Sequence, residues 1–218
     1  MKKYFFLIFP LFLLSSCIDL IDDLTINKDG SGVLKLSINL SKSKLKVNSI
    51  LALDSLNGQR VPKLNEITEK IDFYAGKIEQ KEGIKNVSVS KNTDDYIFKF
   101  TIEFSDIEQL ELALKEILNE ENSSWVNFDF DWIKWEDNTL TRNNLKIPSS
   151  QLSRLKAEDI ENLKTGSYVS ITRFQSPILE FTNDRSKISA DQHALMLRTS
   201  AFNLAENTQI LKNSIKVK

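Results

Sequence analysis

The chain has 218 residues, with 29 basic and 30 acidic side chains and a formal net charge of −1. This balance lacks the basic excess that a nucleic-acid-binding face needs, so we expect no nucleic acid as a partner. Six glycines and four prolines exclude a fibrous or low-complexity chain. The single cysteine, Cys17, means that no disulfide within the chain stabilises the fold.

The first residues have the pattern of a secretory signal. Lys2 and Lys3 supply positive charge, and an unbroken apolar run follows from Tyr4 to Leu14. The run is shorter than the about 20 apolar residues of a membrane-spanning helix, and Pro10 interrupts it. We therefore expect a removable signal peptide and not a spanning anchor.

The signal ends in Leu14-Ser15-Ser16-Cys17, which resembles the lipobox of bacterial lipoproteins. The resemblance implies cleavage before Cys17, a thioether-linked diacylglycerol on its sulfur and an N-linked acyl chain such as palmitate. It divides the chain into a signal peptide (1–16), an acylated cysteine with a short tether (17–23) and a domain (24–218). Because two or more acyl chains give stable anchoring, the mature protein is expected on a membrane of the cell envelope.

The residues after the lipobox bear on the destination. In bacteria with two membranes, Asp directly after the acylated cysteine retains a lipoprotein at the inner membrane. Here Ile18 holds that position and Asp19 follows, which favours the outer membrane. Lys42, Lys44 and Lys46 could face anionic headgroups near so short a tether, although spaced lysines in a loop are more often simply solvated.

From Leu24 onward the pattern alternates hairpins with helices. Residues 24–26 and 34–40 repeat apolar side chains with a period of two around a turn at 27–32, which predicts a hairpin. Residues 41–61 are interpreted as a long loop with a helical turn. An apolar stripe predicts a helix over 62–81, ended by Gly83.

The strongest strand signal covers 96–104, where one face should be buried. A capping box at Ser105 and Glu108 predicts a second helix, and 125–135 with 140–147 predicts another hairpin. Ser149 or Ser150 should cap a third helix that ends near Gly166. Strands at 168–174, 178–181, 187–188, 193–199 and 214–217 and a helix at 204–212 complete the chain. The five apolar side chains of the strong strand are Tyr96, Phe98, Phe100, Ile102 and Phe104.

This order predicts an α+β fold, with an antiparallel sheet built from hairpins and about three amphipathic helices packed on one face. Parallel βαβ units are disfavoured because the strands come in pairs. A weak repeat of hairpin plus helix leaves open a division of the domain near 145–149.

The main candidate ligand site is a strand that combines acids with tryptophans. Asp129 and Asp131 share a strand face with Trp125 and Trp135. Carboxylates next to exposed rings are what a glycan site needs, for hydrogen bonds to hydroxyls and stacking on C–H faces. The alternative is that the rings cover the edge of the core. A hydrolase with paired carboxylates would also need one buried acid with a raised pKa.

Other motifs predict no catalysis. His193 is the single histidine, and Asp191 is the only nearby acid that could orient it. The glycines around Ser31 and before Ser167 do not form a nucleophile elbow. Asn27, Asp29 and Ser31 fit the start of a calcium loop, but Ile38 stands where the bidentate Glu belongs. We expect no catalytic residues, no metal and no cofactor.

The sequence thus indicates a membrane-tethered envelope lipoprotein that is a non-catalytic structural or protein-binding module. Its expected partners are the membrane, through the lipid anchor, and a protein of the envelope. Two alternatives remain open: a glycan- or small-ligand-binding lipoprotein that uses the region 125–135, and a hydrolase with paired carboxylates.

Overall fold

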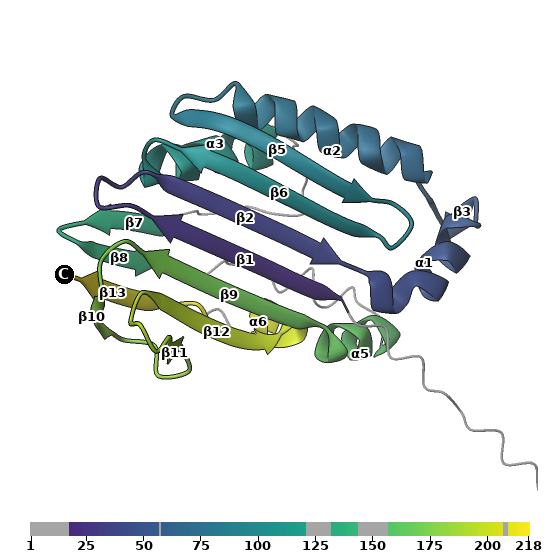
Figure 1. The fold of residues 1–218 in the computed structure, drawn as a ribbon. Coiled ribbons are helices and arrows are strands. Elements are labelled where there is room, and N and C mark those ends of the chain that lie inside the picture. The colour runs from purple at the N-terminus through teal and green to yellow at the C-terminus, as the bar shows by residue number, and fades with distance from the viewer. Residues whose placement is uncertain (1–17, 57, 121–131, 144–156, 207–208) are drawn as a thin grey trace, which may run out of the picture.

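The structure is a computed structural model that describes residues 18–56, 58–120, 132–143, 157–206 and 209–218 (Figure 1). The expected signal peptide (1–16), Cys17 and the proposed boundary at 145–149 lie outside these ranges. So do Trp125, Asp129 and Asp131 of the candidate ligand site.

A large twisted sheet forms the body of the molecule, and a smaller sheet packs at one end of it (Figure 1). The large sheet has the strand order β11-β12-β9-β1-β2-β6-β5, and the small sheet has the order β10-β13-β8-β7. The large-sheet strands are β1 (Asp19–Ile26), β2 (Gly32–Asn39), β5 (Ile84–Asn92), β6 (Ile97–Phe104), β9 (Ser167–Phe174), β11 (Lys187–Ile188) and β12 (Ala194–Ser200). The small-sheet strands are β7 (Ile133–Glu136), β8 (Thr139–Arg142), β10 (Ile178–Phe181) and β13 (Asn213–Val217).

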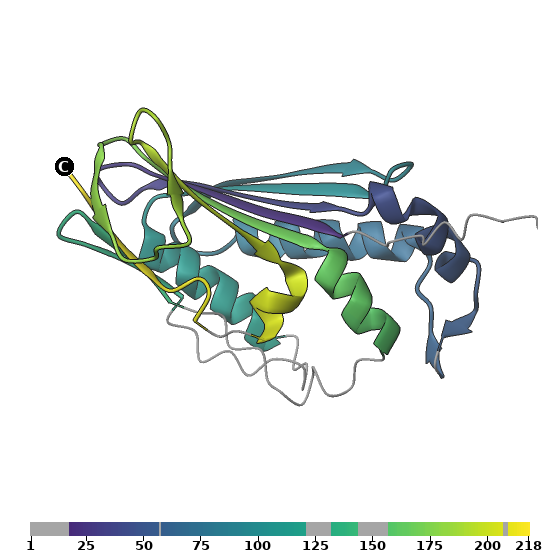
Figure 2. The same ribbon diagram turned by 90° about the horizontal axis from the view of Figure 1, so that it is seen from below.

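The helices lie on one face of the large sheet (Figure 2). They are α2 (Leu64–Glu79), α3 (Ile107–Glu120), α5 (Ala157–Thr165) and α6 (Ala201–Glu206). The prediction of an α+β fold with mostly antiparallel strands and helices on one face is confirmed. Among the residues described, no helix is long and apolar enough to cross a membrane.

One strand pair departs from the expected antiparallel pattern. β1 pairs in parallel with β9, from Asp19 opposite Ser167 to Ile26 opposite Phe174. A tight turn cannot join parallel neighbours. Between β2 and β9 the chain passes through the β5–β6 hairpin, α3 and the β7–β8 hairpin, among other elements. The sheet is therefore not built from hairpins alone.

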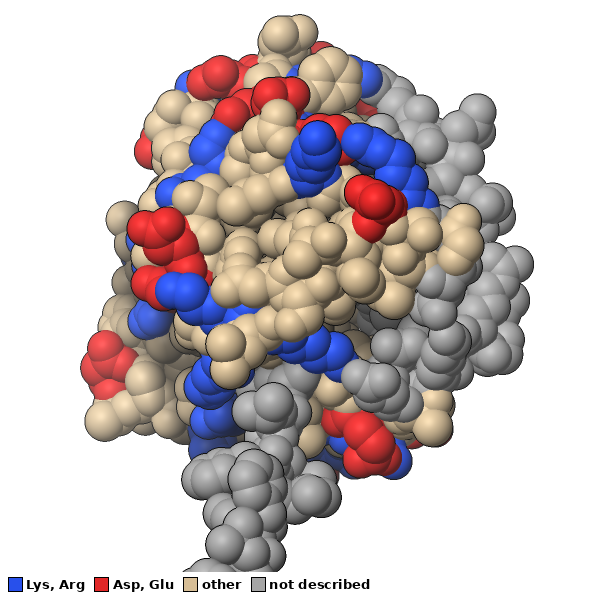
Figure 3. All heavy atoms as spheres, turned by 90° about the vertical axis from the view of Figure 1, so that its right-hand side faces the viewer, with Lys and Arg blue, Asp and Glu red and all other residues tan. Residues whose placement is uncertain are grey.

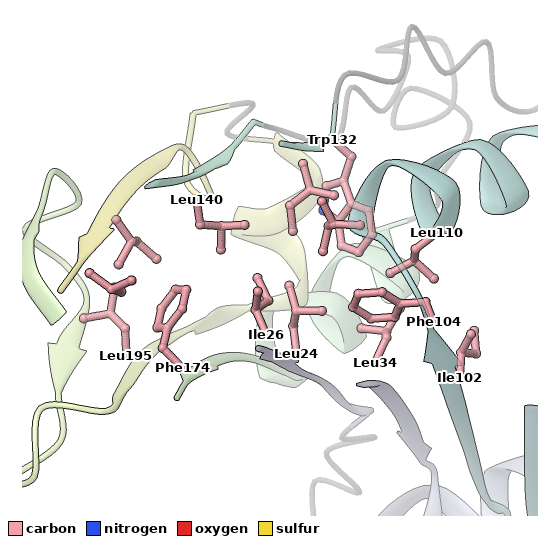
Figure 4. Packing of buried hydrophobic residues seen from close by; sticks show 14 of the residues in the cluster. Leu24, Ile26, Leu34, Ile102, Phe104, Leu110, Trp132, Leu140, Phe174 and Leu195 are labelled. Carbon is pink, nitrogen blue, oxygen red and sulfur yellow. The ribbon is translucent and has the colours of Figure 1, made fainter. Parts of the chain in front are cut away.

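A single cluster of buried apolar side chains joins the two sheets and α3 (Figure 4). Leu24 and Leu34 come from the centre of the large sheet, Leu110 from α3, and Leu140 from the small sheet. The predicted face of the strong strand is confirmed at Phe98, Ile102 and Phe104, which lie on β6 and are buried. Tyr96 is buried too, but it lies in the turn before β6 with a φ of 54°. Phe100 on the same face is only half-buried, so the expectation of five buried side chains is corrected to four.

Two glycines shape the hairpin β1–β2. Gly30 adopts a positive φ of 81° in the turn, where the lack of a side chain removes the steric cost. Gly32 begins β2 so close to β1 that a Cβ there would lie 2.0 Å from the carbonyl oxygen of Thr25. The predicted hairpin is confirmed, and its turn needs glycine at both positions.

The cap of α3 lies one residue later than predicted. Asp106 Oδ1 accepts hydrogen bonds from the backbone N–H groups of Glu108 (2.7 Å) and Gln109 (3.3 Å). Ser105 instead donates its hydroxyl to the carbonyl oxygen of Gly83, at 3.0 Å. Ser105 is thus used to hold the preceding turn, and Asp106 satisfies the free N–H groups at the helix start.

Two segments expected to be irregular are ordered. β1 begins at Asp19, so residues 19–23 of the expected tether belong to the sheet. The expected loop 41–61 contains the 3-10 turn η1 (Ser41–Ser43), the helix α1 (Lys44–Leu51) and the short strands β3 (Ser55–Leu56) and β4 (Gln59–Arg60). The start of β1 and the segment of η1 and α1 thus lie in one region, where Lys42 contacts Asp19.

Candidate functional site

The start of β1 is the part of the fold that lies next to the expected lipid anchor. The carbonyl oxygen of Ile18 accepts a hydrogen bond from the backbone N–H of Ser167, at 2.8 Å, so the chain is already fixed to β9 at Ile18. Only this one residue separates Cys17 from β1. Two residue steps span at most about 7 Å, which is the longest reach from Cys17 to Asp19.

Asp19 is held in place from two sides. The Ser167 hydroxyl donates to Oδ1 at 2.6 Å, and the Lys42 ammonium donates to Oδ2 at 2.9 Å. The Ser167 hydroxyl, and then Lys42, hold the pKa of Asp19 below its ordinary value of 3.8, although partial burial acts in the opposite direction. Ionised Asp19 therefore stabilises the fold above the unfolded pKa, and this contribution is lost as pH falls through the lower folded pKa.

Ser167→Ala is expected to raise the pKa of Asp19, because it removes the donor with the largest effect on the carboxylate. An NMR titration of the Asp19 carboxyl carbon measures the change. Ser88→Ala, at the opposite edge of the same sheet on β5, is the control and should leave the Asp19 pKa unchanged. An unchanged pKa in Ser167→Ala would show that the Ser167 hydroxyl does not set it.

Trp135 is the one member of the candidate ligand site that the structure places. It lies on β7, half-buried, and its ring stacks on Phe174 with 6.1 Å between ring centroids and 25° between planes. Its Cδ1 would lie 3.2 Å from a Cβ added at Gly30. The ring thus packs against the apolar cluster at the edge of the core. A groove between α3 and β7 is lined by other side chains, among them Glu111, Lys115 and Lys134.

A buried ion pair, which was not predicted from the sequence, links the two sheets. Arg142 of β8 donates Nη1 to Asp22 Oδ1 at 3.1 Å and Nη2 to Asp22 Oδ2 at 2.9 Å. The Arg142 and Asp22 side chains are only 4% and 6% exposed. Tyr168 and Ser170 of β9 donate their hydroxyls to the same carboxylate. Asp22 shares the buried face of β1 with Leu24 and Ile26, so its carboxylate needs a buried partner.

The surroundings of this cluster keep the Arg142 guanidinium charged. Burial alone would lower the pKa of Arg142, but the charge of Asp22 and the Tyr168 phenol outweigh it and raise the pKa above the ordinary value. Burial raises the pKa of the Tyr168 phenol, which stays protonated. The cavity beside Arg142 and Ser170 has a volume of about 20 Å³, room for one water molecule. The cluster can hold the sheets together, but it cannot admit an organic substrate.

His193 does not meet a poised nucleophile. Its Nδ1 lies 3.0 Å from the carbonyl oxygen of Phe174. The Asp191 carboxylate accepts hydrogen bonds from the Ser189 hydroxyl and the His193 backbone N–H, and the Ser189 hydrogen bond lowers the pKa of Asp191. Ser189 therefore faces the acid and not the imidazole, so these three residues form a turn without the geometry of a catalytic triad.

In the turn that fits the start of a calcium loop, the polar side chains bond one another within the β1–β2 hairpin. The Asp29 carboxylate accepts hydrogen bonds from the Ser31 hydroxyl at 2.6 Å and the Ser31 N–H at 3.1 Å. These bonds hold the pKa of Asp29 below its ordinary value. Across the described ranges, no group of three or more His, Cys, Asp or Glu side chains is placed to hold a metal ion.

Comparisons with known proteins give one structural similarity. No family model matches the chain, and no curated protein matches it. Among solved structures, the chain is similar to the NMR structure of the folded domain of the Mycobacterium tuberculosis LppM protein. The two chains share 12% sequence identity with a TM-score of 0.44, over 95% of this chain and 94% of that one.

Proposed function

We propose that this protein is a bacterial envelope lipoprotein whose folded domain is held directly against the membrane by the lipid on Cys17. The observation that carries the proposal is the position of β1, which begins two residues after the last residue of the lipobox-like motif. Because β1 begins at Asp19, no spacer separates the cysteine from the folded domain. The domain therefore stands at the bilayer surface, and a partner must lie within reach of it.

The proposed role at that surface is that of a non-catalytic structural or protein-binding module. The histidine faces a backbone carbonyl, the buried carboxylate is paired with an arginine, and Trp135 packs at the core edge. Each of these groups is thus engaged in holding the fold. For the destination, Ile18 after the cysteine supports the outer membrane over the inner membrane.

Cys17→Ser is expected to abolish incorporation of a fatty-acid probe and to leave the protein unprocessed or soluble, because the thioether needs the cysteine sulfur. Gel analysis of probe labelling and fractionation of membranes measure both effects. Ser15→Ala keeps a small residue in the motif and is the matched control, with labelling as in the wild type. Unchanged labelling and membrane association of Cys17→Ser would overturn the proposal.

A further inference from the structure

The segment from Leu40 to Lys63 without residue 57, which we call the α1 surface, contains η1, α1, β3 and β4, and Ser43 of η1 is its buried residue among those whose burial is described. None of the residues in α1 is buried. The segment carries five basic residues, Lys42, Lys44, Lys46, Arg60 and Lys63, against the single acid Asp54. It also leaves three leucines open to solvent: Leu45 is 70% exposed, Leu53 46% and Leu56 41%.

The α1 surface is attached next to the start of β1. Lys42 contacts Asp19 at 2.9 Å, and the backbone N–H of Leu40 donates to the carbonyl oxygen of Tyr96 at 3.1 Å. The Tyr96 hydroxyl in turn bonds the Asn48 side chain of α1. Figure 3, viewed onto this end, shows a broad area without charge, bordered by Lys and Arg side chains with Asp and Glu side chains among them.

The ion pairs of this surface leave its basic groups exposed. Lys42 is 61% exposed while its partner Asp19 is 20% exposed, and Arg60 is 67% exposed beside Glu66 at 36%. In these two pairs the cation is the more exposed partner, whereas in the Lys44–Asp95 pair the two side chains are 46% and 50% exposed. Exposed pairs of this kind are weak, so the cations remain able to turn toward another anion.

The short distance to Cys17 indicates that the α1 surface binds the membrane. This step rests on the proposed function. With lipid on Cys17, the bilayer surface lies within about 7 Å of Asp19, and Lys42 touches Asp19. Charges interact over about 8 Å at physiological salt, so Lys42 lies within the range of the headgroups, and Lys44 follows it at the start of α1. The tether also makes this contact intramolecular, which lets individually weak interactions act together.

We infer that the α1 surface is a second membrane contact, which binds the anionic headgroups of the bilayer that holds the Cys17 lipid. Its basic side chains meet the headgroup phosphates, and Leu53 and Leu56 enter the interface between headgroups and acyl chains, as apolar side chains of interfacial elements do. The contact would orient the domain with β1 pointing away from the membrane and the small sheet distal to it (Figure 1).

A site-specific probe tests this inference. Because acylation blocks Cys17, Leu56→Cys in the full lipidated chain provides one free thiol for a polarity-sensitive fluorophore. The labelled protein is reconstituted in vesicles of phosphatidylglycerol and phosphatidylcholine with brominated acyl chains. We expect a blue shift and at least threefold stronger quenching than for Leu179→Cys, the control on β10 at the opposite end, where Leu179 is 61% exposed.

Further variants separate the possible outcomes. Leu53→Cys should behave like Leu56→Cys, which guards against a local folding defect at one position. Replacing Lys42, Lys44 and Lys46 by Gln should weaken the quenching in phosphatidylglycerol vesicles. Equal quenching at the α1 surface and at β10 overturns the inference, and so does a blue shift that occurs only in native membranes, which would indicate a protein partner. Failure of the lipidated chain to join vesicles would instead refute the proposed function itself.

Discussion

Arg142→Met is expected to lower the free energy of unfolding by about 3–5 kcal/mol, because it leaves the Asp22 carboxylate buried without its cation. The Asp22 side chain is 6% exposed and receives two hydrogen bonds from Arg142. The hydroxyls of Tyr168 and Ser170 remain, but they carry no compensating charge. Equilibrium urea unfolding followed by circular dichroism measures the loss.

The same two strands offer a matched control on the opposite face of the sheet. Arg173 of β9 bonds Asp23 of β1 with Nε–Oδ1 at 2.9 Å and Nη2–Oδ2 at 3.0 Å, but the arginine is 47% exposed. Arg173→Met should therefore cost less than about 1 kcal/mol. Equal losses of unfolding free energy in the two variants would show that burial does not determine the cost of removing the arginine.

A double variant separates two contributions to the free energy of unfolding: the cost of burying an unpaired carboxylate and the net contribution of the ion pair. Asp22→Leu combined with Arg142→Met removes both charges, and apolar replacement of a buried pair is often neutral. We expect the double variant to recover most of the stability lost in Arg142→Met. If the double variant is as unstable as the single one, the pair contributes through its specific geometry between β1 and β8.

Local pattern predicts the elements whose partners are near in sequence. The hairpin β1–β2 follows from alternation around a glycine-containing turn, and α2 follows from its apolar stripe. The buried face of β6 follows from a period of two. In each of these elements the contacting residues lie within about 20 positions of one another, so the hydrophobic periodicity of the sequence predicts the element.

The start of β1 shows why the tether prediction was too long. Three acids, Asp19, Asp22 and Asp23, suggest a solvated segment, since strands seldom carry so much charge. In the fold, Asp19 meets Ser167 and Lys42, Asp22 meets Arg142, and Asp23 meets Arg173. Most of these partners follow more than a hundred residues later, so no local pattern could reveal that a strand begins here.

Helix α1 was not predicted because it lacks a buried apolar stripe. A helix is recognised by the apolar stripe that it buries, and α1 buries none of its residues. Its basic residues were noted in the sequence, but their place beside the anchor follows only from the contact between Lys42 and Asp19. The candidate surface thus depends on tertiary structure, whereas the candidate anchor is local to residues 14–17.

Phe104→Ala is expected to lower the free energy of unfolding by about 3–5 kcal/mol, because the ring is buried and its removal leaves a cavity. Phe104 is 1% exposed in the cluster that joins both sheets and α3. Phe100→Ala, on the same face of β6, should cost about 1–2 kcal/mol, since its half-buried ring keeps part of its contact with water. Urea unfolding of the two variants measures the difference, and equal losses would show that the burial along β6 is wrong.

A second substitution tests what fills the space around Phe104. Gly32 faces it across the β2–β6 pair, and a Cβ there would lie 2.7 Å from the Phe104 Cζ. The added methyl of Gly32→Ala would point toward the cavity left by Phe104→Ala. The same Cβ would also lie 2.0 Å from the backbone oxygen of Thr25, which stays in place. We therefore expect Gly32→Ala to destabilise Phe104→Ala further, and a recovery of stability in the double variant would show that β1 and β2 can separate at this point.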